Sequence, residues 1–353
     1  MADGVIEPTG AHVAAGQSDR AGHGGRAGQG GAATTPPSEA GVDAAMRARS
    51  GRRLRGVGAA VLSLVLATAG CGNPPGVDGD LTNGWAAIGV PAGFTPVAGT
   101  CHLANFSTAG SRSSYEEVDC ALKHRTETVY VGDYPGPAAE ADAPPANDSA
   151  AQRQAYENCD AKTTAYVGAP WRTARLWIGV TQPTEAAWAG GARWYRCEVL
   201  VSSSVEDDAG LVQRVGSLRG ALRETGSPLL LGCYGVQLDK AGKISTMPAT
   251  PCAAEHNAEF VGVWEAPADA GYPDSGKEWD EFHAGCRALI AAYVDVPDDS
   301  DLQYRAGVVS LPGGDDVWEM GDRGVRCYLW VDTAPLTSSL KGKGEQALPV
   351  QYQ

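Results

Sequence analysis

Cysteine, histidine and glutamate recur together at one spacing, Cys-x-x-x-His-x-x-Glu, in two places along the chain. The six residues are Cys120, His124, Glu127, Cys252, His256 and Glu259. Thiolates and imidazoles bind zinc, so Cys101 or Cys233 completing either set would make a metal site. Structural zinc sites usually have more closely spaced cysteine pairs. We therefore favour oxidised cysteines, with histidine and glutamate bracing the turn before a strand, and predict no bound metal or cofactor.

The chain has nine cysteines, and they fall into a group of one and two groups of four. Cys71 stands alone at the end of an apolar run. The other eight are Cys101, Cys120, Cys159, Cys197, Cys233, Cys252, Cys286 and Cys327. An even number of regularly spaced cysteines behind an export signal indicates a disulfide framework.

Four cysteines allow three pairings, and the spacing alone does not choose among them. The third cysteine of each group lies on the apolar stripe of an expected helix, and the fourth lies in a strand that this helix should cover. We therefore prefer the pairs Cys101–Cys120, Cys159–Cys197, Cys233–Cys252 and Cys286–Cys327.

A secretory signal precedes the framework. Residues 46–55 are densely basic, residues 56–70 are apolar, and the small residues Ala69 and Gly70 come before Cys71. These features are typical of a secretory signal, and the apolar run is shorter than the roughly 20 residues of a transmembrane helix. The last residues resemble a bacterial lipobox, which predicts lipid attachment (palmitate) at Cys71. The alternative is an ordinary signal with an incidental cysteine.

The composition and net charge of the chain limit the kinds of partner that it can bind. Residues 1–45 are rich in Gly and Ala and lack apolar periodicity, which predicts disorder, unless Met46 rather than Met1 is the true start. Removing residues 1–71, with their 7 Arg and 5 acidic residues, changes the net charge from −14 to −16. So acidic a protein is repelled by nucleic acid and by anionic lipid. We expect no nucleic-acid partner, and localisation on the extracytoplasmic face of the cell membrane through the lipid on Cys71.

Two stretches of the chain repeat each other, residues 101–220 and 233–342. Besides the cysteines, the matched residues include Tyr166 with Tyr293, Trp188 with Trp318, Gly191 with Gly321, and Ser217 with Ser339. We predict a disordered or wrongly assigned start (1–45), a lipoprotein signal (46–71), a flexible tether (72–95), a first module (96–225), a second module (226–345) and a tail (346–353).

Each module is expected to be an α+β unit, an antiparallel sheet with one packed helix, stapled by two disulfides. β-branched and aromatic runs place strands around Cys101 and Cys233 and over residues 127–131, 176–181, 195–201, 259–264, 306–311 and 325–331. Apolar residues at helical spacing place one helix around Cys159 and another around Cys286.

The tryptophans divide into two kinds. Trp188 and Trp318 hold the same place in the two modules, so we expect them in the core beside the closing strands. Trp171, Trp194 and Trp330 have no equivalent in the other module. We favour a core position for most of them, and any that were exposed would offer a binding surface. His102 and His283 are also unmatched, and we interpret both as incidental.

The repeated Cys-x-x-x-His-x-x-Glu block, the Tyr-Val after the helical cysteine and the Trp-x-x-Gly-x-x-x-x-x-Cys ending resemble the septum formation domain of actinobacterial lipoproteins. The resemblance covers both modules, roughly residues 96–345. It implies an envelope-anchored protein associated with cell division.

The sequence has few features that would support catalysis. It contains no Cys-x-x-Cys, no Gly-x-Ser-x-Gly elbow and no phosphate-binding loop. We therefore predict a non-enzymatic protein of the cell envelope that binds another envelope protein or a cell-wall ligand. The alternative is an envelope enzyme that acts on cell-wall polymers.

Overall fold

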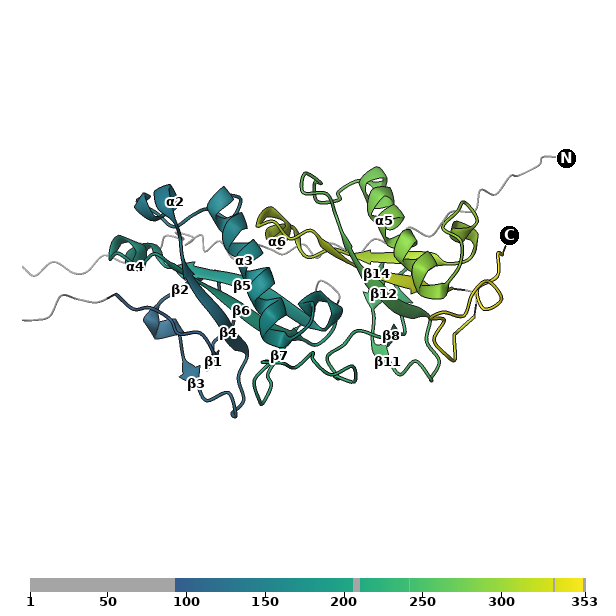
Figure 1. Ribbon diagram of the computed structural model, residues 1–353, viewed down its shortest axis with the longest axis horizontal. Helices are drawn as coiled ribbons and strands as arrows, with labels where there is room; N and C mark the ends of the chain where they lie inside the picture. Colours follow the sequence, from purple (N-terminus) through teal and green to yellow (C-terminus); the bar gives the residue numbers. More distant parts are fainter. Residues whose placement is uncertain (1–92, 206–209, 241, 333, 352–353) are drawn as a thin grey trace, which may run out of the picture. The chain divides into compact units, whose positions relative to one another are not determined.

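Two sheets, each with a long helix packed on one face, make up the fold (Figure 1). The computed structural model describes residues 93–205, 210–240, 242–332 and 334–351. The start, the signal with Cys71 and most of the tether lie outside these residues. The predicted α+β class is confirmed, and the described residues belong to one compact unit. The boundary between the two modules at residue 225 stays a prediction.

The first module contains a seven-stranded sheet in the order β2-β5-β6-β4-β1-β3, with β7 also paired to β6. Its elements are β1 (Thr100–His102), β2 (Ala109–Gly110), η1 (Arg112–Ser114), β3 (Glu117–Val118), β4 (Thr126–Asp133), α2 (Gly136–Glu140), α3 (Ala150–Val167), η2 (Trp171–Thr173), β5 (Leu176–Pro183), α4 (Glu185–Ala189), β6 (Trp194–Ser202) and β7 (Leu211–Val212). The sheet is antiparallel except where β2 pairs with β5 in parallel, which the sequence analysis did not anticipate.

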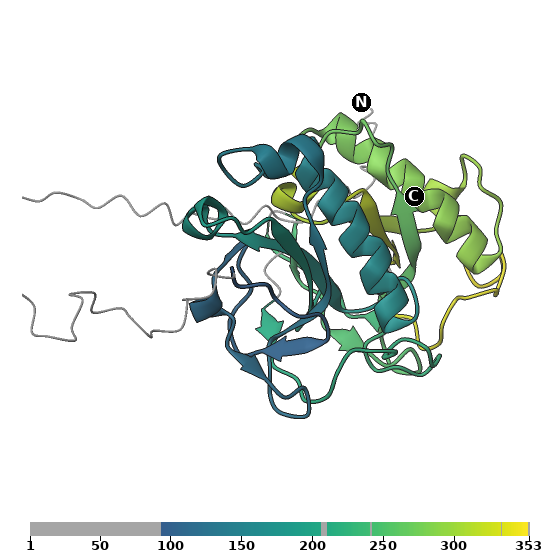
Figure 2. The same cartoon turned by 60° about the vertical axis from the view of Figure 1, so that its left-hand side comes forward.

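The second module contains a five-stranded sheet in the order β11-β8-β12-β14-β13 and a separate β9–β10 pair. Its elements are β8 (Cys233–Tyr234), β9 (Gln237–Leu238), β10 (Ile244–Thr246), β11 (Ala249–Thr250), β12 (Ala258–Glu265), α5 (Gly276–Val294), η3 (Leu302–Tyr304), β13 (Gly307–Leu311), α6 (Asp315–Glu319) and β14 (Gly324–Trp330). Figures 1 and 2 show α3 (teal) across the first sheet and α5 (light green) across the second.

Local residues explain where the long helices begin and end. The side chain of Ser149 caps α3 by accepting a hydrogen bond from the backbone N–H of Gln152. Gly168, at φ 97°, ends this helix in the left-handed region that glycine tolerates best. In α5 the carboxylate of Glu278 accepts the backbone N–H of Ser275 at 3.0 Å.

The disulfides occupy matching positions in the two modules. Cys159–Cys197 joins α3 to β6, and Cys286–Cys327 joins α5 to β14. Cys101–Cys120 and Cys233–Cys252 join a short strand to the loop that leads into the next long strand. These are the four pairs that the sequence analysis prefers. Each helix is therefore covalently attached to the sheet that it covers.

The tryptophans contribute to the cores. Trp188 in α4 and Trp318 in α6 are buried beside the closing strands, and each indole N–H donates to a backbone carbonyl, of Ala141 and Ala270 respectively. The three unmatched tryptophans also lie in the core, as the favoured interpretation expects, so they offer no exposed binding surface. Trp171, Trp194 and Trp330 are only 2%, 2% and 6% exposed, because each ring packs within the fold.

The two modules share part of their interior. Val317 and Met320, at the α6 end of the second module, are buried in the core of the first. Arg172 forms an ion pair with Asp322, whose side chain is only 4% exposed. The guanidinium of Arg326 donates to the backbone carbonyls of Arg172 and Leu176 at 3.0 and 2.8 Å. Polar groups removed from water need such partners, so these contacts fix the two modules to one another.

Within the described residues, we find no helix with the length and apolarity of a membrane span.

Candidate functional site

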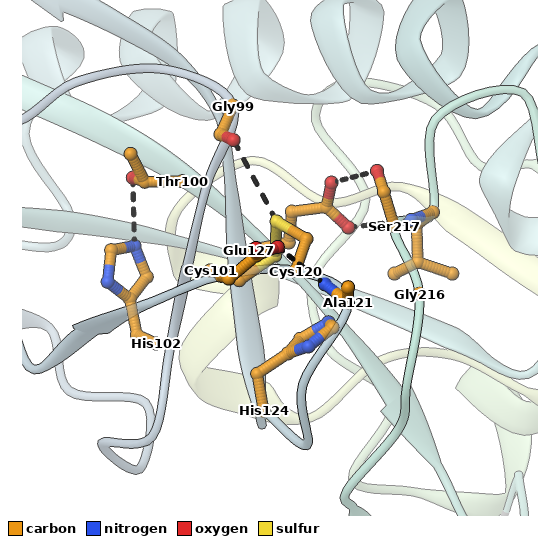
Figure 3. The surroundings of a disulfide bond; sticks show 12 residues. Gly99, Thr100, Cys101, His102, Cys120, Ala121, His124, Glu127, Gly216 and Ser217 are labelled. Atoms are coloured by element: carbon orange, nitrogen blue, oxygen red, sulfur yellow. Dashed lines mark hydrogen bonds between the residues drawn. A yellow bond between two sulfur atoms is a disulfide. The ribbon is translucent and has the colours of Figure 1, made fainter.

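The duplicated histidine and glutamate lie beside the first disulfide of each module. Glu127 is the second residue of β4, and Glu259 is the second residue of β12. Both carboxylates are buried, with at most 1% exposure. Figure 3 shows Glu127 next to the Cys101–Cys120 disulfide, with Ser217 hydrogen-bonded to it. A buried carboxylate is stable only if hydrogen bonds replace its hydration, so its partners decide what the site does.

In the first module, Glu127 holds three separate segments together. Its carboxylate accepts hydrogen bonds from the hydroxyl of Tyr166 in α3 and from the hydroxyl of Ser217. It also accepts the backbone N–H of Leu218 at 2.7 Å. Strand, helix and the segment after β7 therefore meet at one charged group.

The second module repeats this arrangement residue for residue. Glu259 accepts from the hydroxyl of Tyr293 at 2.8 Å, from the hydroxyl of Ser339 at 2.7 Å and from the backbone N–H of Leu340 at 2.8 Å. Two independent copies of one buried network indicate a shared folding requirement.

The histidines orient the loop before each long strand. The Nδ1 atom of His124 lies 2.9 Å from the carbonyl oxygen of Leu122, and that of His256 lies 2.8 Å from the carbonyl oxygen of Ala254. Because a carbonyl only accepts, each Nδ1 carries the proton. The Nε2 atom of His256 lies 3.3 Å from Glu259.

The first module differs at this point. In the described part of the chain, the Nε2 atom of His124 has no hydrogen-bond partner although the residue is buried. His124 thus braces its loop by the Nδ1 contact and by backbone pairing with Arg214.

Some of these atoms lie close enough together to suggest a metal site. Ligand atoms of Cys101, Cys120 and Glu127 lie within 4.8 Å of one another. The same holds for Cys233, His256 and Glu259 in the second module. However, the sulfur atoms are bonded to each other in disulfides, and zinc binds thiolates. The carboxylates also already accept three hydrogen bonds each. The donor set does not fit zinc in this oxidised form, and the absence of a metal stays a prediction.

The tyrosines of the two networks remain proton donors. Burial, followed by the hydrogen bond to Glu127, raises the pKa of Tyr166. Burial raises the pKa of Tyr293 to about 12. Both hydroxyls therefore stay protonated at neutral pH and donate hydrogen bonds to the carboxylates. Neither acts as a base.

A second buried polar cluster lies in the first module, on strands β1, β4 and β6. The Nε2 atom of His102 lies 2.8 Å from the hydroxyl of Thr128, which donates to Glu198 at 2.6 Å. Arg196 lies 3.0 Å from the same carboxylate. Burial, followed by the charge of Arg196, lowers the pKa of His102 to about 4, and burial raises the pKa of Glu198.

Aromatic side chains take the place of this cluster in the second module. Tyr234, Phe260 and Tyr328 stand at the positions of His102, Thr128 and Glu198, and they pack against one another. The interpretation of His102 as incidental missed the cluster. Alignment of the two repeats places His102 against Tyr234. This difference is the sequence signal that would have revealed the cluster. His283 lies 2.9 Å from the hydroxyl of Ser310 and is buried.

Removing either duplicated carboxylate should destabilise the fold. We expect Glu127→Ala and Glu259→Ala each to lower the free energy of unfolding by roughly 2–4 kcal/mol, because buried donors lose their acceptor. Urea unfolding followed by tryptophan fluorescence measures this. Glu157→Ala on the exposed side of α3 is the matched control and should stay within about 0.5 kcal/mol. Equal effects of Glu127→Ala and the control would contradict the bracing role.

His102 should make the protein sensitive to acid. The folded protein keeps His102 neutral down to pH about 4, whereas the unfolded chain takes up this proton near pH 6.5. Stability from this group is complete above pH 6.5 and falls by up to about 3 kcal/mol as the pH drops to 4. Glu198, with its raised pKa, takes up a proton earlier when folded and offsets part of this loss.

The test compares urea unfolding of the parent and His102→Asn between pH 7 and pH 4. We expect a smaller loss of stability in the variant, because its amide does not titrate. Parallel pH profiles for the two proteins would show that His102 does not titrate as the structure indicates.

One comparison with known proteins identifies the family. A family model described as "Septum formation" matches residues 98–327 in a single span that crosses both modules. Comparisons with curated proteins and with solved structures give no match. The match begins two residues before β1 and ends at Cys327 in β14, so it covers the four disulfides, the whole network around Glu127, and Glu259 and Tyr293 of the second network. The chain therefore belongs to the septum formation family.

Proposed function

We propose that the chain is an exported, lipid-anchored protein of the cell envelope that acts by binding, without catalysis, in septum formation or cell-wall processes. Its partner is another envelope protein or a cell-wall ligand. Family membership supports the connection with division and the envelope. The four disulfides suit an oxidising compartment outside the cytoplasm.

One observation carries the non-enzymatic part of the proposal. The residues that the sequence singles out for chemistry are buried and already bonded to the protein itself. Glu127 and Glu259 each accept three hydrogen bonds from the protein, and their neighbouring cysteines are oxidised. A general base or nucleophile has to be accessible to its substrate. The two carboxylates are buried within the protein and are not accessible.

Lipid anchoring through Cys71 is tested by substitution. We expect Cys71→Ala to leave the signal uncleaved or to release the protein from the membrane fraction into the culture medium, because the acylated residue is lost. Cell fractionation and intact-mass analysis measure both outcomes. Unchanged mature mass together with unchanged fractionation would argue against acylation.

The binding role is tested against the enzymatic alternative. We expect the purified chain to release no soluble fragments from peptidoglycan, and crosslinking in living cells to capture a defined envelope partner. The double substitution His124→Ala/His256→Ala should alter folding or partner capture only. Peptidoglycan hydrolysis by the parent protein that disappears in the folded double variant would overturn the proposal.

A further inference from the structure

A pocket of about 450 Å³ opens beside the Cys101–Cys120 disulfide of the first module. Its lining includes Glu117, Asp119, Cys120, Tyr166, Ser217 and Arg219. Figure 3 shows Cys120 and Ser217 on either side of the buried Glu127. The duplicated network therefore forms one wall of this pocket. Small-ligand sites typically measure about 300–1,000 Å³, so the pocket has room for a small molecule or a peptide end.

Arg219 provides a positive charge that is held in place. Its guanidinium lies over the ring of Tyr166, 4.3 Å from the ring centre. That ring is itself fixed, because its hydroxyl donates to Glu127. The Arg219 side chain forms no ion pair with any residue that the structure describes. A guanidinium stacked on one face keeps its N–H edge available to bind a carboxylate in bidentate fashion.

Two carboxylates also line this pocket. Glu117 belongs to β3, and Asp119 follows this strand. One oxygen of Asp119 accepts a hydrogen bond from the backbone N–H of Ala121 at 2.8 Å. This contact orients the carboxylate and leaves its other oxygen available to a ligand. Across the described ranges, neither carboxylate forms an ion pair with a protein cation. The pocket thus holds opposite charges that do not neutralise each other.

We propose that this pocket binds a zwitterion, with the ligand's carboxylate on Arg219 and its ammonium group on Glu117 and Asp119. A free amino acid and a short peptide with both ends free share this chemistry. The inference names the ligand class for the binding role proposed above and rests on that role.

The second module supplies an internal comparison. It keeps the glutamate, tyrosine and serine of the network, as Glu259, Tyr293 and Ser339. At the positions of Glu117 and Asp119 it has Ala249 and Pro251 instead. Lys341 replaces Arg219, 5.9 Å from the ring of Tyr293. Since the second network persists without the two carboxylates, the fold does not require them, which favours a ligand-binding role for Glu117 and Asp119 in the first module.

The test is calorimetric titration of the full chain, purified in detergent, with alanyl-alanine. We expect measurable binding that weakens by about 10-fold or more when the carboxylate is amidated or the amine is acetylated, since each change removes a charge-assisted contact. Free alanine is the second arm. Binding of alanine at least as tight as that of the dipeptide assigns the site to amino acids, and tighter binding of the dipeptide assigns it to short peptides.

Variants then place the ligand. Arg219→Gln and the double change Glu117→Gln/Asp119→Asn should each lower the affinity by about 10-fold or more, whereas Lys341→Gln in the second module should not. Thermal melting checks that each variant is folded, and the blocked ligands test the charges on the unaltered chain. The absence of dipeptide and alanine binding at 10 mM, or equal binding of the blocked forms, would overturn the inference. If crosslinking still captures an envelope partner, the proposed function survives that outcome.

Discussion

The buried carboxylate at the start of each long strand is the constraint on which the fold depends. Removing a charged group from water is costly unless several donors replace its hydration. Glu127 meets that requirement only when β4, α3 and the segment that carries Leu218 come together. Glu259 imposes the same condition on the second module. Each carboxylate therefore acts as a joint between segments that are distant in sequence, and the adjacent disulfide holds the neighbouring loop beside it.

This joint also connects the interior of the first module to its surface. The hydrogen bond from Tyr166 to Glu127 fixes the tyrosine ring, and the ring supports the guanidinium of Arg219. A buried charge thereby sets the position of an exposed one. The second module keeps the joint but presents a lysine and no opposing carboxylates. The two copies thus share a structural solution while differing in the surface built on it. The same divergence appears in the sheets. His102 and Glu198 of the first module correspond to the aromatic residues Tyr234 and Tyr328 of the second.

Much of the architecture could be predicted from local patterns. Cysteines on the apolar stripe of a helix, such as Cys286, have to face the sheet, and alternating or β-branched runs mark the long strands. Three features of the structure were not predicted from the sequence. The helices α4 and α6 have five residues each, too few for a periodicity to be recognised. Glu198 belongs to β6, which is buried along its whole length, and its partner Thr128 comes from a strand 70 positions away in sequence. The ion pair of Arg172 with Asp322 joins residues 150 positions apart, so only the tertiary structure brings it together.

Amide hydrogen exchange at Leu218 and Leu340 measures whether the two carboxylates hold their segments together, because these N–H groups donate to them. Replacing Glu127 by Gln removes the charge while keeping the shape of the side chain. We expect exchange at Leu218 then to accelerate by about 10-fold or more, while exchange at Leu340 in the intact second module changes much less. Unchanged protection at Leu218, or equal acceleration at both positions, would show that the carboxylate does not hold the three segments together.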